Sequence, residues 1–176
     1  MEGRLSGTLE VPEDAVRRFT DAARKAVADQ NWFAALFVSL ALPDICGSLE
    51  NPTAKVGERY MNWFNRYLAP RYGKMFSAED CYYFRCACLH QGLGAHERSR
   101  NDGIHFIPPP PRGNIVHLNL LNNVLQMQID IFCIDVCDAV ERWTVDVAGN
   151  AEIQGRICQL LHIHPLSSLR PFIAFD

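Results

Sequence analysis

Residues 77–92 read SAEDCYYFRCACLHQG, and they hold signals for the start, the body and the end of one α-helix. Ser77 can cap the first turn, and Asp80 stands three residues later, where a capping box places its acidic partner. Gly92, followed by Gly94, favours a stop because glycine readily adopts the left-handed conformation that ends helices. The pattern predicts a helix over 78–91, and this helix carries the residues best suited to chemistry.

Helical periodicity dominates the rest of the chain. Further helices are predicted over residues 13–28, 32–46, 52–68, 119–143 and 151–161. The second is almost wholly apolar and is therefore expected at the centre, with Pro43 kinking or ending it and Gly47 closing it. Pro52 is expected to begin the third helix and Pro70 to end it. The carboxyl half of 119–143 is apolar on nearly every face, so neighbouring helices or a second subunit should bury it.

Residues 93–118 interrupt this pattern with glycines and with four consecutive prolines, Pro108–Pro111. The prolines favour an exposed polyproline II excursion, and residues 104–107 and 115–118 are predicted to pair as a small hairpin. The predicted fold class is therefore all-α: one up-down bundle of five to six helices with a long Pro-rich loop or small hairpin inserted before the penultimate helix. We expect a single domain over 1–176, with its core over about 13–143 and a C-terminal helix and tail over 149–176.

Composition limits the functional classes. The 176 residues are 48% hydrophobic and 21% charged, as in soluble globular proteins, and the net charge of −3 excludes a global positive field for nucleic acid. Residues 66–105 nevertheless carry six Lys/Arg against four acids. Residues 1–10 lack an apolar signal-peptide core, and the longest dense apolar run, 32–42, is too short to span a bilayer. We expect a soluble, cytoplasmic protein with no membrane segment.

Arg85 and His90 form the leading candidate for catalysis. A five-residue helical step rotates by about 140°, so the two side chains do not point the same way, but arginine is long and His90 lies in the last turn. Both could reach one cleft, especially one shared across a two-fold axis. Imidazole can move a proton while guanidinium holds a phosphate and stabilises developing charge. The alternative is structural: His90 interacts with the helix dipole, and Arg85 pairs with an acid on a neighbouring helix.

An all-α domain with this Arg-x4-His motif on a late, Tyr-bearing helix resembles the HEPN superfamily. The resemblance implies an RNA-binding homodimer paired around the motif helices and a metal-independent ribonuclease site, with Arg85 and His90 as its catalytic residues. It also implies a toxin–antitoxin or phage-defence setting, with a protein antitoxin as a possible partner. The sequence departs from many active members at Cys86, where they have a polar residue. Because the family includes members without activity, the alternative is a non-catalytic dimerisation or binding module of the same fold.

Neighbouring residues are candidates for substrate binding. Tyr82 and Tyr83 can stack a nucleobase, although core packing is expected for one of them. His96, Arg98 and Arg100 follow the motif helix and can add phosphate contacts if an RNA strand crosses its end.

The seven cysteines favour buried free thiols over a metal site. Cys86 and Cys88 point about 160° apart on a helix, and the spacing of the group does not match a zinc knuckle. Cys133 and Cys137 share a helical face, and His162 and His164 could add ligands. A Cys86–His90 nucleophile lacks an evident oxyanion hole. The sequence therefore predicts no metal and no cofactor.

Overall fold

The computed structural model describes residues 12–98, 100 and 102–164. Helices are formed by α1 Pro12–Ala28, α2 Trp32–Glu50, α3 Val56–Tyr67, α4 Ala69–Tyr72, α5 Ala78–Gln91, α6 Ile129–Val147 and α7 Ala151–Ile157. A small sheet is formed by β1 Gly103–Ile107, β2 Asn119–Leu121 and β3 Val124–Gln128, with a 3-10 turn at Pro111–Gly113 between β1 and β2. The chain is mostly helical, as predicted, but the sheet makes the strictly all-α description incomplete.

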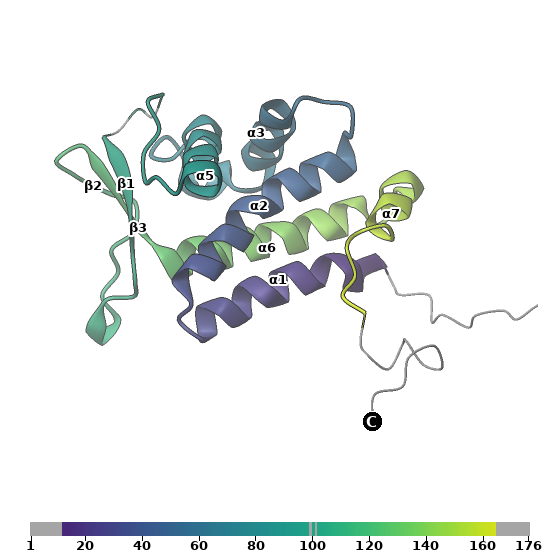
Figure 1. The fold of residues 1–176 in the computed structure, drawn as a ribbon, viewed down its shortest axis with the longest axis horizontal. Helices are drawn as coiled ribbons and strands as arrows, with labels where there is room; N and C mark the ends of the chain where they lie inside the picture. The colour runs from purple at the N-terminus through teal and green to yellow at the C-terminus, as the bar shows by residue number, and fades with distance from the viewer. Residues whose placement is uncertain (1–11, 99, 101, 165–176) are drawn as a thin grey trace, which may run out of the picture.

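Helix α2 lies at the centre of the molecule. It packs against α1 and α6 on one side and against α3 and α5 on the other, while the sheet and α7 lie at opposite ends (Figure 1). Asn31 caps its start by accepting a hydrogen bond from the backbone N–H of Ala34 at 3.3 Å. Helices cover α2 on several sides, as expected for a helix that is apolar on nearly every face.

The predicted end of this central helix was wrong. Helix α2 continues through Pro43 and Gly47 and ends at Glu50. Proline in a helix interior removes one backbone hydrogen bond, and the burial of Pro43 in the core offsets that loss. Gly47 does not end the helix. It lies at the contact with α3, where a Cβ would lie 2.8 Å from the carbonyl oxygen of Arg59. The glycine allows α2 and α3 to approach closely.

The uninterrupted α2 also changes the membrane analysis. It has 19 residues, and 18 consecutive ones have a mean hydropathy of 1.6, so it is long and apolar enough to cross a bilayer, contrary to the expectation from the run that ended at Leu42. Half of its apolar window is buried within the protein. This burial is compatible with the central helix of a soluble protein.

Helices α3 and α4 also differ from the predicted boundaries. Helix α3 begins at Val56 rather than at Pro52, and its start carries no side-chain cap. Pro70 lies in the first turn of α4, where a missing N–H costs no helical hydrogen bond. It therefore opens a short helix instead of ending the previous one.

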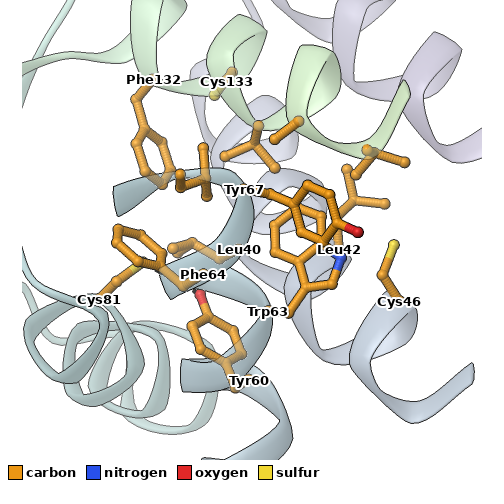
Figure 2. Packing of buried hydrophobic residues seen from close by; sticks show 14 of the residues in the cluster. Leu40, Leu42, Cys46, Tyr60, Trp63, Phe64, Tyr67, Cys81, Phe132 and Cys133 are labelled. Atoms are coloured by element: carbon orange, nitrogen blue, oxygen red, sulfur yellow. Dashed lines mark hydrogen bonds between the residues drawn. The ribbon is translucent and has the colours of Figure 1, made fainter. Parts of the chain in front are cut away.

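The core is rich in aromatic residues and thiols. Figure 2 shows side chains of α3 packed between α2, α5 and α6. Its largest fully buried members include Tyr60, Trp63 and Phe64 of α3 and Phe132 of α6. Five of the seven cysteines are buried, as expected for small hydrophobic residues, whereas Cys86 is half-buried and Cys158 is exposed. Burial raises the pKa of the Cys133 and Cys137 thiols to about 12, which keeps them protonated.

The sequence-based prediction differs most from the structure in the region before α6. Residues 119–128 form a β2–β3 hairpin instead of the first turns of a helix, and β1 pairs in parallel with β3, with Gly103 opposite Val124. The predicted strand over 104–107 exists, but its predicted partner, 115–118, is not a strand. Asn122 and Asn123 both have positive φ, 48° and 60°, the conformation of a type I′ hairpin turn. Asparagine tolerates this conformation better than most residues.

We predict that Gly47→Ala destabilises the protein by about 1–3 kcal/mol, the usual cost of overpacking, because the new Cβ would collide with backbone of α3. Gly155→Ala in α7 is the matched control, since a Cβ there has no heavy atom within 4 Å. The control should leave stability unchanged or raise it by about 0.5–1 kcal/mol. Urea unfolding of the two variants and the parent measures both effects. Equal stability of the two variants would contradict the close α2–α3 contact.

Candidate functional site

Helix α5 has the boundaries that the sequence predicts. The Ser77 backbone N–H donates to Asp80 Oδ2 at 3.0 Å, and the Asp80 backbone N–H donates to Ser77 Oγ at 3.1 Å, which completes the capping box. Gly92 ends the helix in the left-handed conformation with φ 69°. The helix buries Cys81, Phe84 and Cys88 against the body of the protein. Arg85 lies at the edge of this buried face, and His90 lies on the exposed side of the helix.

Arg85 is anchored by a carboxylate from the central helix. Its Nη2 lies 3.1 Å from Oδ2 of Asp44 on α2, and Nε of Arg59 on α3 lies 2.8 Å from Oδ1 of the same carboxylate. The three side chains are only 13–18% exposed. Asp44 therefore links α2, α3 and α5 through one partly buried cluster. Two guanidinium groups and one carboxylate leave this cluster with a formal charge of +1.

The second amino group of Arg85 contacts the other half of the motif. Nη1 of Arg85 lies 3.3 Å from Nε2 of His90, and His90 is exposed to solvent. The two Cα positions are rotated by about 140° around the helix, but the arginine side chain is long enough to close that angle. The contact forms within one chain. The length of the arginine thus brings together two side chains whose positions on the helix point in different directions.

This arrangement suits an anionic ligand. Asp44 holds one edge of the Arg85 guanidinium, while Nη1 stays beside an accessible imidazole. An oxyanion at this position would meet a cationic hydrogen-bond donor and a group that can give or accept a proton. These are the two kinds of group that charge stabilisation and proton transfer require.

Asp44 and Arg59 were not among the residues singled out from the sequence. Asp44 is the only charged residue between Trp32 and Leu49, in a stretch otherwise suited to the core. A charge in such a helix needs a partner, because burying an ionised carboxylate alone is costly. That requirement was an available signal that a basic side chain lies against α2. It could not identify which of the many arginines does so.

Tyr82 and Tyr83 are placed differently. The Tyr82 ring packs between α5 and α3, 5.6 Å from the ring of Tyr60, and a Cβ on Gly57 would lie 3.1 Å from it. Burial, together with the neighbouring Cys86, raises the pKa of Tyr82. Tyr83 is half-buried on the outer side of α5, where it contacts residues of the following loop. The core-packing role expected for one of the two tyrosines thus falls to Tyr82.

The three loop residues divide into two groups. His96 and Arg98 lie against Tyr83, with a ring separation of 5.0 Å for His96 and a guanidinium-to-centroid distance of 5.8 Å for Arg98. Arg100 instead binds the Asp80 carboxylate through Nε, at 2.9 and 3.1 Å, and donates from Nη2 to the Lys74 carbonyl oxygen at 3.2 Å. Asp80 precedes His90 by ten residues, about 15 Å along a helix. The structure therefore does not bring Arg100 to the Arg85–His90 pair.

Within the described ranges, which omit residues 1–11, 99, 101 and 165–176, no three His, Cys, Asp or Glu side chains gather as metal ligands would. No protein-family model, no curated protein and no solved structure matches the chain. The roles of the site residues therefore rest on their geometry.

We predict that Asp44→Asn lowers the free energy of unfolding by about 1.5–3 kcal/mol, because it removes charge-assisted hydrogen bonds and leaves Arg59 and Arg85 close together. Asp29→Asn is the control, since its pair with Lys25 is exposed and one helical turn away. Its effect should stay within about 0.5 kcal/mol. Urea unfolding tests both variants. A loss at Asp44 no larger than that at Asp29 would rule out an anchoring role.

Proposed function

We propose that this protein is a HEPN-like, cytoplasmic, homodimeric endoribonuclease that cleaves RNA without a metal ion. The observation that carries the proposal is the 3.3 Å contact between Nη1 of Arg85 and Nε2 of the exposed His90, with Arg85 anchored on Asp44. Arg85 binds the scissile phosphate, and His90 acts as general acid or base. The imidazole of His90 is exposed, so a substrate can reach it from solvent.

The chemistry follows from these two groups. The 2′-hydroxyl of the substrate loses its proton to an imidazole, and its oxygen forms a bond to phosphorus. The bond from phosphorus to the 5′-oxygen breaks, and that oxygen takes a proton from a second imidazole. A homodimer with two motif helices around one cleft supplies both imidazoles. Arg85 stabilises the extra negative charge on the phosphoryl oxygens of the transition state.

Two further features support this proposal. The cluster of Asp44, Arg59 and Arg85 carries a formal charge of +1 in a protein whose net charge is −3, which favours a phosphate at this position. Phe33 and Phe37, 76% and 40% exposed, stack edge to face on α2. Steps of four and seven residues place them on the same helical face as Asp44. An exposed aromatic pair on that face suits a second copy of the chain.

We predict that the purified protein cleaves single-stranded RNA in the presence of EDTA. His90→Ala should lower the cleavage rate by about 10²–10⁴-fold, the usual contribution of a general acid or base. Arg85→Lys should also lower the cleavage rate. The single ammonium group of lysine cannot bind Asp44 and a phosphate at the same time as the two edges of a guanidinium can. The control is His105→Ala, an exposed histidine on β1, which should cleave at the parental rate. Equal cleavage by the parent and His90→Ala, or none by the parent, would refute the proposal.

A second candidate is a non-catalytic dimerisation or binding module of HEPN-like fold. One observation favours it: Arg85 is only 13% exposed and pairs with Asp44, as a structural arginine would. In that case Arg85→Lys lowers the stability of the protein and has no RNA activity to reduce. A toxin–antitoxin or phage-defence role, with a protein antitoxin as partner, suits either candidate.

A further inference from the structure

One face of α5 carries Tyr83, Cys86 and His90 toward solvent. Their spacing of i, i+3 and i+7 places them on a single stripe of the helix. Tyr83 and His90 are seven residues apart, which separates them by about 10 Å along the axis. The stripe thus leads from the imidazole of the proposed site toward the amino end of α5.

The far end of this stripe forms an aromatic and cationic platform, which consists of Tyr83, His96 and Arg98. The rings of Tyr83 and His96 are stacked, with centroids 5.0 Å apart and an angle of 18° between their planes. The Arg98 guanidinium carbon lies 5.8 Å from the Tyr83 centroid, and the Arg98 backbone N–H donates to Nδ1 of His96 at 3.2 Å. Arg98 is exposed to solvent, and His96 is half-buried. The loop after α5 therefore folds back along the helix and groups two stacked rings with an exposed guanidinium.

We propose that this platform binds an unpaired nucleobase of a single-stranded RNA whose scissile phosphate lies at Arg85 and His90. The inference rests on the proposed function and adds to it a subsite that binds one base of the substrate. Aromatic side chains bind bases of any sequence by stacking, at about 1–3 kcal/mol per base, and a nearby arginine adds a cation–π or phosphate contact.

The accessibility of the bases decides which form of the strand can bind, since the roughly 10 Å between His90 and Tyr83 is a span of only a few nucleotides. The bases of a duplex hide their faces in the stack and cannot reach a side chain. An extended single strand offers its bases freely. The platform therefore binds a neighbouring nucleotide of an unpaired strand rather than a duplex.

The test measures binding apart from cleavage. Full-length protein with His90→Ala is titrated against a fluorescent ten-nucleotide single-stranded RNA, the same RNA with abasic positions, and a duplex of the same sequence, with anisotropy as the readout. Adding His96→Ala should weaken binding of the intact single strand by about 5- to 100-fold. Adding His96→Phe, which keeps the stacking surface, should stay within about two-fold of the parent. Thermal melting of each variant checks that it is folded.

The four possible results are as follows. The platform is supported if the His90→Ala protein binds abasic RNA and duplex weakly, and if adding His96→Ala does not weaken the binding of these two RNAs further. It is overturned if abasic RNA binds as tightly as intact RNA, or if His96→Phe loses as much affinity as His96→Ala. Base-dependent binding by a wild-type protein that does not cleave RNA would remove the proposed nuclease and keep the platform. Equal cleavage of single-stranded and duplex RNA, unchanged by His96→Ala, would keep the nuclease and remove the platform.

Discussion

The carboxylate of Asp44 is the constraint on which the site depends. It lies on the central helix, in a stretch otherwise suited to the core, and it is only 17% exposed. An ionised carboxylate in such a place needs compensating donors. Arg59 of α3 and Arg85 of α5 provide them. One charge thus links two further helices to α2 at defined points, and together with the buried apolar face of α5 it sets the rotation of that helix about its own axis.

The properties of the motif follow from that rotation. With Cys81, Phe84 and Cys88 turned inward, the stripe of Tyr83, Cys86 and His90 faces solvent. Arg85 lies at the boundary, where one edge of its guanidinium binds Asp44 and the other reaches His90. Cys86, the residue directly after Arg85, lies on the outer face and is half-buried. It takes no part in the Arg85–His90 contact.

Much of the fold could be predicted because its signals are local. The cap at Ser77, the stop at Gly92 and the apolar character of 32–46 each act within a few residues, and the structure confirms the helix and the central position that they indicate. Pro43 was misleading because tertiary burial outweighs a local helix-breaking preference. The Asn122–Asn123 turn was missed because the apolar spacing around it also suits a helix. The Asp44 cluster joins residues 15 to 41 positions apart, so only the packed structure could place it.

The most direct test is a double-mutant cycle between Asp44 and Arg85, measured as unfolding free energy. The two single substitutions, Asp44→Asn and Arg85→Gln, are compared with the double variant. The anchoring role of Asp44 predicts that the two losses do not add, with an interaction energy of about 0.5–3 kcal/mol. Additive losses would contradict it, because Arg85 would then be positioned by something other than the carboxylate of the central helix.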